Sequence, residues 1–359
     1  MRIVAHNGAR IWGGAERATV SLLSGLQGRG HDVLLLCNDP LVASEAASRG
    51  VPSRICAIGG DVMLHHALRL ARVLEQIAPD AFIVGTYKKL FLATLGARLA
   101  HVPRIVARVG LESDTPRSRK YKIALRRWTD GVAVNARRIV APFAELEGFG
   151  PEKVALIWNS VATESYESGS GGVRRELGIR DDEFVIGTVA RLAKQKRLDR
   201  LIRALQKLPG AHCIIAGDGS ARTGLQQIAV GAGVADRVHF LGNRADVHDI
   251  IDALDVFVLT SDSEGMSNAM LEAMAHGRPV VSTDVSGAED ALSGPPAAGI
   301  IVGFDDVAVA RAISTLRDDP QLRESMGRAG KERVMREFSR EAMLDAWEKF
   351  LAPAGTNVR

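Results

Sequence analysis

The chain of 359 residues lacks several features that mark common classes of protein. No apolar run approaches the roughly 20 residues that a membrane-spanning helix needs. The opening residues, MRIVAHNG, have no apolar core of the kind found in secretory signals, so we expect a cytoplasmic protein. Only three cysteines occur, Cys37, Cys56 and Cys213, far apart in apolar surroundings. We expect buried thiols in a reducing compartment, not a disulfide framework.

Motifs for redox cofactors and metals are also missing. Gly217 and Gly219 begin a dinucleotide-binding fingerprint, but Arg222 stands where its third glycine should fall. The chain has no Asp-x-Asp pair, which holds a metal ion in many transferases, and its nine histidines show no ligand spacing. We therefore expect no metal and no cofactor.

What the sequence does contain is a repeated alternation of strand-like apolar runs and stretches of helical length. This pattern predicts two α/β/α domains with parallel sheets, and the length suits two domains of roughly 150 to 200 residues each. The polar, Gly- and Ser-rich residues 163–175 predict the linker between them. The predicted strands are 2–6, 31–37, 81–85, 104–109, 131–135 and 153–158 in the first half, and 184–190, 212–217, 237–242, 256–260 and 278–283 in the second.

Three strand-to-helix loops have residues that could bind an anion. Gly8–Arg17 places Gly13 and Gly14 before a helix, where backbone N–H groups can approach a phosphate. It is not a P-loop, because Gly14 and Ala15 stand where Lys and Ser or Thr are required, and a glycine turn needed only for chain geometry is the alternative. The second loop carries Arg191 and Lys196, which can reach one anion or form only a solvated face.

The third loop, residues 263–281, holds two glutamates, Glu264 and Glu272, around a helix that Ser267 can cap. Carboxylates near a helix N-terminus favour the ionised form, so we expect them to bind sugar hydroxyls and not to act as general acids. With a diphosphate between them, the arrangement fits a nucleotide sugar. Either glutamate alone also fits a solvated helix residue. Three methionines in this segment are interpreted as core residues: Met266, Met270 and Met274.

Charge is distributed unevenly along the chain, with a net charge of about +9 in residues 1–160 and about −5 in the remainder. The segment 117–128 interleaves cations with apolar residues, which fits an anionic membrane surface or, equally, a solvated helix face. We expect no nucleic-acid binding, because no recognised motif accompanies the charge. The cations of this segment are Arg117, Arg119, Lys120, Lys122, Arg126 and Arg127.

Residues 263–281 resemble the E-x7-E motif of the retaining, nucleotide-sugar-dependent glycosyltransferase family 4, and further motifs follow in family order: GGAER, GLQGRGHDV, LIWNSV, IAGDGS, RVHFLG and FSREAMLDAWEKF. The resemblance implies the GT-B fold, with two Rossmann-like domains and an interdomain cleft. The acceptor-side domain would comprise residues 1–162 together with 339–359, and the donor-binding domain would comprise residues 173–338. The last helix would cross back to the first domain.

The resemblance also implies roles for residues. Arg191 and Lys196 would hold the donor diphosphate and Glu272 the ribose, and Glu264 would contact the transferred sugar. With Arg191 and Lys196, Glu264 makes up the predicted catalytic set. The remaining predicted donor contacts are Gly13, Gly14, Phe240, Leu241, Gly265, Met266, Ser267 and Asn268.

The chain departs from the family pattern in the first half, where Arg108, Val109 and Gly110 stand in place of a histidine near the reacting sugar. We predict a metal-independent, retaining hexosyltransferase that uses a nucleotide sugar and an envelope glycan or lipid-linked acceptor, peripheral at the cytoplasmic membrane. The alternative is a non-catalytic partner that keeps the fold and binds donor or membrane. A dehydrogenase is disfavoured because the chain lacks the dinucleotide-binding fingerprint. A glycosidase is disfavoured because it would need one of the two glutamates to stay protonated.

Overall fold

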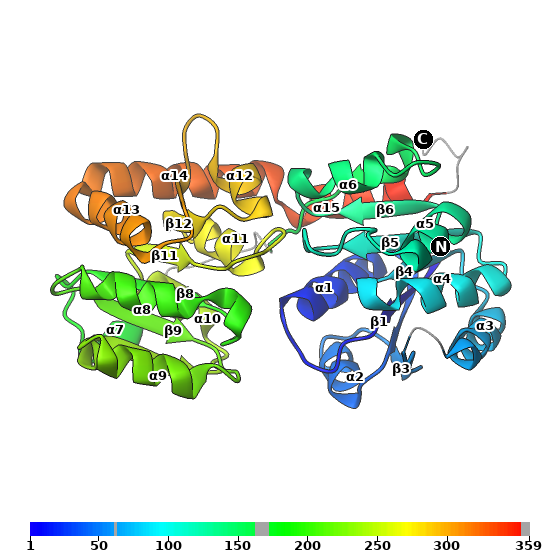
Figure 1. Ribbon diagram of the computed structural model, residues 1–359, viewed down its shortest axis with the longest axis horizontal. Coiled ribbons are helices and arrows are strands. Elements are labelled where there is room, and N and C mark those ends of the chain that lie inside the picture. The colour runs from blue at the N-terminus through cyan, green and yellow to red at the C-terminus, as the bar shows by residue number, and fades with distance from the viewer. Residues whose placement is uncertain (61–62, 162–171, 353–359) are drawn as a thin grey trace. The chain divides into compact units, whose positions relative to one another are not determined.

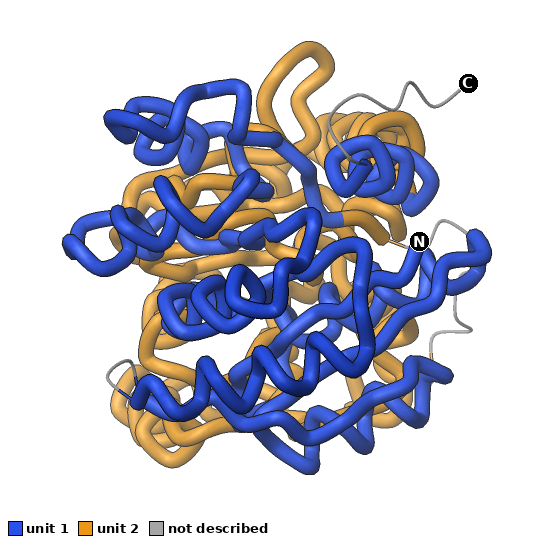
Figure 2. Tube along the Cα trace, turned by 90° about the vertical axis from the view of Figure 1, so that its right-hand side faces the viewer, with its two compact units in different colours: residues 1–159, 340–359 blue, residues 160–339 orange. Residues whose placement is uncertain are grey.

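The computed structural model describes residues 1–60, 63–161 and 172–352. Contacts divide the chain into two compact units, coloured separately in Figure 2. Unit 1 comprises Met1–Asn159 and Arg340–Arg359, and unit 2 comprises Ser160–Ser339. Each unit is built around its own parallel sheet.

The sheet of unit 1 has seven strands in the order β3-β2-β1-β4-β5-β6-β7, all parallel. Along β1, Val4 packs against one face and Ile3 and Ala5 against the other, so both faces of the sheet are covered. The strands are β1 (Arg2–Asn7), β2 (Asp32–Cys37), β3 (Ser53–Ile55), β4 (Ala81–Val84), β5 (Arg104–Val109), β6 (Gly131–Val134) and β7 (Val154–Leu156).

Helices of unit 1 cover these two faces, with α3, α4 and α5 on one and α1, α2 and α15 on the other (Figure 1). The helices are α1 (Gly14–Gly28), α2 (Pro40–Ala47), α3 (Leu64–Ile77), α4 (Leu90–Leu99), α5 (Arg119–Trp128), α6 (Ala141–Ala144) and α15 (Arg340–Leu351). Short 3-10 turns are η1 (Tyr87–Lys89), η2 (Arg137–Ile139) and η3 (Pro151–Lys153).

The last helix, α15, packs on unit 1, as predicted. Trp347 is 3% exposed within the core on the α1 side of the sheet. A Cβ atom on Gly25 of α1 would lie 2.7 Å from a methyl carbon of Leu344, so the glycine lets the two helices approach closely. Arg29 donates hydrogen bonds to Asp345 at 2.6 Å and Glu348 at 2.8 Å. These contacts fix α15 against α1.

The sheet of unit 2 has six strands in the order β10-β9-β8-β11-β12-β13, again all parallel. The strands are β8 (Val185–Val189), β9 (His212–Ala216), β10 (Val238–Gly242), β11 (Val256–Leu259), β12 (Val280–Thr283) and β13 (Gly299–Val302). The helices are α7 (Gly172–Glu176), α8 (Leu198–Gln206), α9 (Arg222–Gly231), α10 (Val247–Asp252), α11 (Asn268–Ala275), α12 (Ser286–Leu292), α13 (Asp306–Asp318) and α14 (Pro320–Glu337), with 3-10 turns η4 (Lys194–Lys196) and η5 (Ala235–Arg237).

The predicted fold class is confirmed, and the differences are at its margins. The short edge strands β3 and β13 were not predicted, because their residues are exposed or only half-buried. The predicted linker was wrong at its end: residues 172–175 belong to α7, where Val173 is buried. Residues 163–171 of that linker lie outside the described residues. The three cysteines are buried and unpaired, and no helix in the described ranges is long and apolar enough to cross a membrane.

Candidate active site

The loop after β8 carries the two predicted phosphate-binding cations. Arg191 is exposed, and Lys196 ends η4, two residues before α8 begins. The apolar face of α8 is buried as predicted and holds the loop against the core of unit 2. Its residues are Leu198, Leu201, Ile202 and Leu205, each at most 3% exposed.

The joint between η4 and α8 is Arg197, which has a left-handed backbone with φ of 48°. Its guanidinium donates two hydrogen bonds to Asp199, at 3.0 and 3.1 Å, and contacts Asp262 at 3.3 Å. Burial, the largest single influence, opposes the ionisation of Asp199, but the hydrogen bonds from Arg197 together with the charges of Arg197, Arg203 and Arg200 outweigh it and lower the pKa of Asp199 below its ordinary value. This ion pair stabilises an otherwise unfavourable backbone conformation.

Lys196 and Glu264 form an ion pair, although 68 residues separate them in sequence. The carboxylate of Glu264 also accepts a hydrogen bond of 2.8 Å from the hydroxyl of Ser261. The two side chains are 21% and 12% exposed, so both are partly shielded from solvent. A cation and an oriented carboxylate therefore lie side by side, a combination that suits a ligand with both phosphate and hydroxyl groups.

The loops after β8 and β11 are tied together because these strands are neighbours in the sheet. Gln195 donates from its side-chain amide to the carbonyl of Ser263 at 2.5 Å, and its own carbonyl accepts from the N–H of Asp262 at 2.9 Å. The hydroxyl of Thr260 donates to the carbonyl of Lys196 at 3.0 Å. These bonds fix the loops that position Lys196 and Glu264.

The helix after β11 begins as the sequence predicted. Ser267 is the N-cap of α11, and its hydroxyl accepts a hydrogen bond from the N–H of Met270 at 3.4 Å. Glu272 lies in the second turn of this helix and is half-buried. The interpretation of the methionines as core residues is confirmed by exposures of 4%, 0% and 0% for Met266, Met270 and Met274.

The backbone around Gly265 rests directly on α12. The N–H of Gly287 donates to the carbonyl of Gly265 at 3.1 Å, and a Cβ atom at Gly287 would lie 2.3 Å from that same oxygen. Only glycine therefore allows this approach. The contact holds the segment from Glu264 to Asn268 at the start of α11.

Glycines after β9 support the Arg191 loop in the same way. Gly217 has φ of 123°, and a Cβ atom there would lie 2.0 Å from the carbonyl oxygen of Ala190. Leu192 donates its N–H to the carbonyl of Asp218 at 2.9 Å. The Gly-x-Gly that fails as a dinucleotide fingerprint thus positions the backbone on both sides of Arg191.

Phe240 and Leu241 are half-buried residues near the end of β10, the edge strand beside β9. The register of β10 shifts between Phe240 and Gly242, and Arg222 donates to the carbonyl of Phe240 at 3.4 Å. Their place, two strands from β8 at the carboxyl edge of the same sheet, fits the contact to a base that the resemblance implies.

Gly13 and Gly14 belong to unit 1, where Gly13 is the N-cap of α1 and Gly14 its first residue. Gly13 has an extended backbone with φ of −151°, and a Cβ atom on Gly14 would meet nothing within 4 Å. Chain geometry therefore does not require glycine at position 14. The absence of a side chain at Gly14 leaves the backbone at the start of α1 uncovered. This weighs against the interpretation of the loop as a turn needed only for chain geometry.

Arg108, one of the three residues that stand in place of the family histidine, is the second-last residue of β5 and lies beside α1. Its guanidinium donates to the hydroxyl of Thr19 at 3.1 Å, the carbonyl of Ala15 at 3.4 Å and the side chain of Asn159 at 2.9 Å. Burial lowers the pKa of Arg108 to about 10, and the charge of Glu16 opposes this shift. The residue therefore places a desolvated cation next to the first turn of α1.

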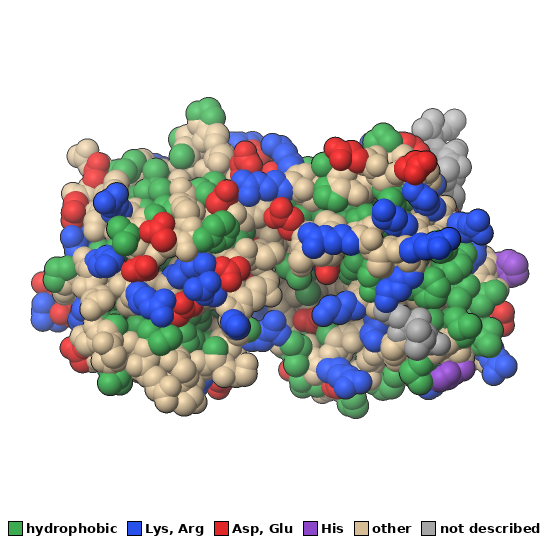
Figure 3. Space-filling model, in the orientation of Figure 1, with side chains coloured by type: hydrophobic (Ala, Val, Ile, Leu, Met, Phe, Trp, Pro, Cys, Tyr) green, Lys and Arg blue, Asp and Glu red, His purple; other side chains and the backbone are tan. Residues whose placement is uncertain are grey.

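The basic segment forms α5, preceded by Arg117. Its apolar residues face inward: Leu125 is fully buried, and Tyr121 and Trp128 pack against the same core, whereas Ile123 is 36% exposed. A shallow depression on its outer face is lined by Arg119, Lys122, Ile123, Arg126 and Arg127. Lys and Arg side chains gather on the face of unit 1 that carries this helix (Figure 3).

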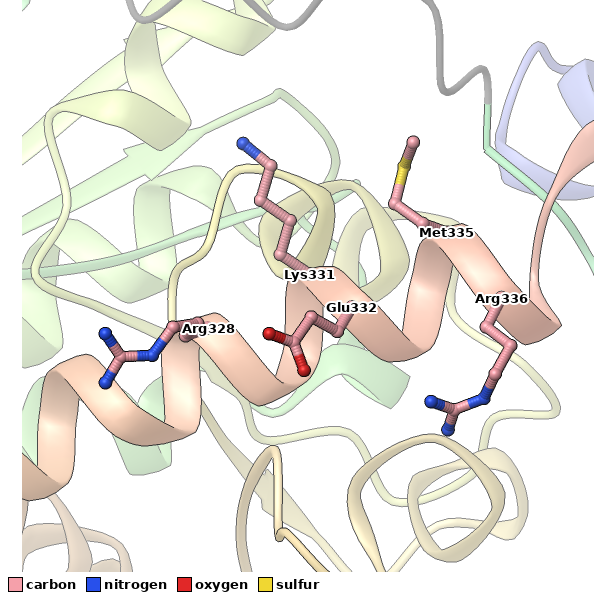
Figure 4. A pocket seen from close by; sticks show the side chains of 5 residues that line it. All are labelled: Arg328, Lys331, Glu332, Met335 and Arg336. Carbon is pink, nitrogen blue, oxygen red and sulfur yellow. The ribbon is translucent and has the colours of Figure 1, made fainter.

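A second shallow depression lies on α14 in unit 2. Its lining side chains all come from this one helix: Arg328, Lys331, Glu332, Met335 and Arg336. Lys331 and Met335 project to one side of the helix and Arg336 to the other (Figure 4). It is an open helix surface, and it contains none of the predicted site residues.

The structure thus brings Lys196 and Glu264 into contact and places Arg191, Phe240, Leu241 and residues 265–272 on neighbouring loops and strand ends of one sheet. Gly13 and Gly14 lie in the other unit. Within residues 1–60, 63–161 and 172–352, no three His, Cys, Asp or Glu side chains are grouped so that they could hold a metal ion.

Comparison with protein families gives a match over most of the chain. Residues 12–165 match the family described as Glycosyltransferase Family 4, and residues 172–333 match Glycosyl transferases group 1. The chain belongs to these glycosyltransferases.

Individual relatives share about a third of their residues with this chain over the matched region. The chain is 35% identical over 190 residues to the lipopolysaccharide core biosynthesis glycosyltransferase LpsE of Rhizobium meliloti, covering 52% of this chain and 56% of the relative. It is 33% identical over 174 residues to LpsD of the same organism, covering 48% and 51%. The chain spans about half the length of the curated relatives it matches.

Solved structures share the fold over the whole length. The structure of Anabaena Alr3699/HepE in complex with UDP and glucose superposes with a TM-score of 0.86 at 22% identity, covering 98% of this chain and 99% of that one. The two Rossmann-like units are therefore those of a GT-B glycosyltransferase.

Sequence reasoning singled out the loops that carry Lys196 and Glu264 but missed the residues that support them. Ser261, which bonds Glu264, stands three residues before it, yet a serine in a polar loop carries no signal of that contact. The partners of Arg108 and the role of Gln195 depend on loops that meet only in the folded unit.

Proposed function

We propose that this chain is a retaining glycosyltransferase that moves a hexose-type sugar from a nucleoside-diphosphate sugar to an envelope glycan or lipid-linked acceptor. The single observation that carries the proposal is the Lys196–Glu264 pair, at the carboxyl edge of the unit 2 sheet and four residues before α11. Ligands of open α/β sheets bind at this edge. Membership of the glycosyltransferase family supports the same reaction class.

The chemistry of the pair suits a sugar diphosphate. Lys196, together with Arg191 and the N-terminus of α11, would neutralise the charge that develops on the leaving diphosphate. Glu264 would accept hydrogen bonds from hydroxyls of the transferred sugar and Glu272 from those of the ribose. The missing Asp-x-Asp motif favours this cationic route over one that requires a metal ion.

In the proposed reaction, the bond between the anomeric carbon and the leaving phosphate oxygen breaks. The acceptor oxygen forms its new bond on the same face of that carbon, so configuration is retained. The proton of the acceptor hydroxyl passes to the leaving phosphate, and no further reactant is needed. The role of the protein is to position the groups and to stabilise the charge of the leaving group.

The relatives support the substrate classes. The UDP and glucose bound by the Anabaena protein support a nucleoside-diphosphate donor, and the names of LpsE and LpsD support an envelope glycan as acceptor. The exposed cations of α5 support docking on an anionic membrane from the cytoplasmic side. Because the apolar residues of α5 mostly face the core, this docking would be electrostatic and not by insertion.

Thermal unfolding with UDP, GDP, ADP and TDP, and with their common sugar conjugates, tests the donor site. A ligand at 100 times its Kd adds about 2.7 kcal/mol to the free energy of unfolding. We expect a shift in Tm with one base, and a smaller shift in Glu272→Ala. Glu332→Ala on α14 is the control and should respond as wild type does. No shift with any nucleotide in folded protein would contradict the proposal.

A further inference from the structure

The residue that follows Lys196 has a strained backbone. Of the described residues other than glycine, three have a positive φ: Ala78, His101 and Arg197, at 50°, 53° and 48°. Ala78 and His101 come just after α3 and α4, where a left-handed residue commonly ends a helix. Arg197 instead precedes a helix, because it is the N-cap residue of α8. The usual explanation for a left-handed residue therefore does not apply to Arg197.

Two carboxylates hold the side chain of Arg197. Its guanidinium donates two hydrogen bonds to Asp199, at 3.0 and 3.1 Å, and one to each carboxylate oxygen of Asp262, at 3.3 Å. Asp262 also forms an ion pair of 2.7 Å with Arg200, one turn further along α8. Arg200 is 8% exposed, and it donates to the carbonyl of Thr260 at 3.0 Å. Asp262 therefore ties two arginines at the start of α8 to the loop after β11.

These ion pairs adjoin the Lys196–Glu264 pair along the chain. Arg197 is the neighbour of Lys196, and Asp262 stands two residues before Glu264. The backbone joins the two loops as well, since the carbonyl of Lys196 accepts a hydrogen bond from the hydroxyl of Thr260 at 3.0 Å. A change in the turn at Arg197, or in the place of Asp262, would move the ammonium and the carboxylate of the pair relative to each other.

The charge at the start of α8 also requires these carboxylates. The N-terminus of a helix carries a partial positive charge, which disfavours cations there. Arg197 and Arg200 nevertheless lie at the N-cap and in the first turn of α8, next to Lys196. Asp199 and Asp262 neutralise the two arginines, which leaves the ammonium of Lys196 as the cation that faces Glu264.

We propose that Arg197 and Asp262 are positioning residues, which hold the strained turn after Lys196 so that Lys196 and Glu264 keep the geometry needed for sugar transfer. The inference rests on the proposed function, and both residues act through that pair and not on the substrate. Backbone strain of this kind persists only where the surrounding structure enforces it, and it is concentrated at functional sites. Asp262 enforces it from a loop 65 residues away along the chain.

Two substitutions at position 197 separate strain from charge. Arg197→Ala removes the guanidinium but keeps a residue that disfavours the left-handed backbone, so we expect kcat for transfer to fall about tenfold. Arg197→Gly also removes the guanidinium, but glycine adopts this backbone readily, so kcat should stay within about threefold of wild type. Loss of charge alone would not produce this recovery.

Asp262→Asn tests the other half of the network. In the wild-type background kcat should fall about fivefold, and in the Arg197→Gly background by less than about twofold, because the turn then no longer depends on the ion pair. The affinity for a nucleotide that raises Tm should not fall in Asp262→Asn, because the cations of the site are retained. Arg203→Ala is the matched control. It removes another Arg–Asp ion pair of α8, of 3.1 Å, and should keep the wild-type kcat.

Hydrogen exchange tests the positioning without any substrate. The N–H of Asp262 bonds the carbonyl of Gln195 at 2.9 Å. This N–H should exchange about tenfold faster in Arg197→Ala than in wild type, and at close to the wild-type rate in Arg197→Gly. Arg203→Ala should leave its exchange unchanged. All rates are measured below the Tm of each variant, so that only folded protein is compared.

Two results would overturn the inference: kcat and exchange equal to wild type in Arg197→Ala and Asp262→Asn, or a kcat of Arg197→Gly as low as that of Arg197→Ala, which would assign the effect to the lost charge. Failure of the proposed function is a separate outcome. If wild type transfers no sugar but exchange follows the expected order, the transferase is contradicted and the positioning of the pair stands. If wild type transfers sugar and all variants match it, the positioning alone fails.

Discussion

The loops that follow the strands of the two sheets differ in how completely their polar groups are satisfied. In unit 2, Lys196 is paired with Glu264, and close glycine contacts such as that of Gly287 fix the loops. In unit 1, the hydroxyls of Tyr87, Thr115 and Ser118 have no partner among the described residues, and the cation of Arg108 donates to the neutral groups of Ala15, Thr19 and Asn159. The loops of unit 2 are held in place by paired charges and backbone contacts, whereas those of unit 1 keep hydroxyl groups without partners.

This difference fits the two substrates proposed. A donor shared by many enzymes of one family requires the same diphosphate contacts each time, so preorganised loops reduce the entropy cost of binding it. Acceptors vary from enzyme to enzyme, and an edge with unsatisfied groups takes its specificity from a few side chains. Four predictions test this contrast.

The largest effect is expected on the preorganised side. Lys196→Ala should lower the rate of transfer about 100- to 1000-fold, because a cation that stabilises leaving-group charge is lost. Lys194→Ala, an exposed lysine in the same 3-10 turn, should retain the wild-type rate. The measurement is kcat for sugar transfer in the two variants. Equal rates would remove Lys196 from the site.

The second prediction concerns acid stability and involves unit 1. Burial lowers the pKa of His6 from 6.5 to about 4, against the hydrogen bond with the carbonyl of Cys56. The neutral ring is favoured in the folded state, so its contribution is full above pH 6.5 and decreases as pH falls towards 4. Between pH 6.5 and pH 4, this effect lowers the free energy of unfolding by about 3 kcal/mol.

Urea unfolding at pH 7 and pH 4.5, followed in unit 1, measures this effect. His6→Gln should show a smaller difference between the two pH values than wild type. His65→Gln, which changes an exposed ring on α3, should keep the wild-type difference. If His6→Gln also keeps the wild-type difference, His6 is not the source of the acid sensitivity.

A third comparison concerns two glycines, one at each edge. Gly287→Ala should lower the free energy of unfolding by roughly 1 to 3 kcal/mol, since its Cβ would overlap the carbonyl of Gly265. Gly14→Ala should be neutral or stabilising, because the site is open and alanine favours a helix. Thermal unfolding of both variants measures these two changes in stability. A destabilised Gly14→Ala would show that unit 1 is as closely fitted here as unit 2.

The smallest effect is expected at the surface of α5. Lys122→Gln should weaken binding to phosphatidylglycerol vesicles by about 1 kcal/mol, or roughly fivefold, at low salt. Lys331→Gln on α14 removes an exposed charge from unit 2 and should not change binding. Vesicle co-sedimentation compares the two. Equal affinities would make the charges of α5 an ordinary solvated face.

The sequence predicted most strands and singled out the loops in which Lys196 and Glu264 lie, because apolar runs and glycines are local signals. It did not predict β13, an edge strand whose residues are only half-buried. The pairing of Lys196 with Glu264 joins residues 68 apart, and no spacing rule connects them. The unsatisfied hydroxyl of Tyr87 is invisible in sequence, since a tyrosine after a strand is ordinary until its neighbours are known.

The position of α15 has a consequence for how the chain is made. Unit 1 takes Trp347 and Leu351 into its core, yet these residues are synthesised after the whole of unit 2. Because domains generally fold as units during synthesis, unit 2 can fold while the α1 side of unit 1 still exposes apolar surface. Unit 1 is therefore synthesised before unit 2 but completed after it, and of the two it is the one that needs protection from aggregation.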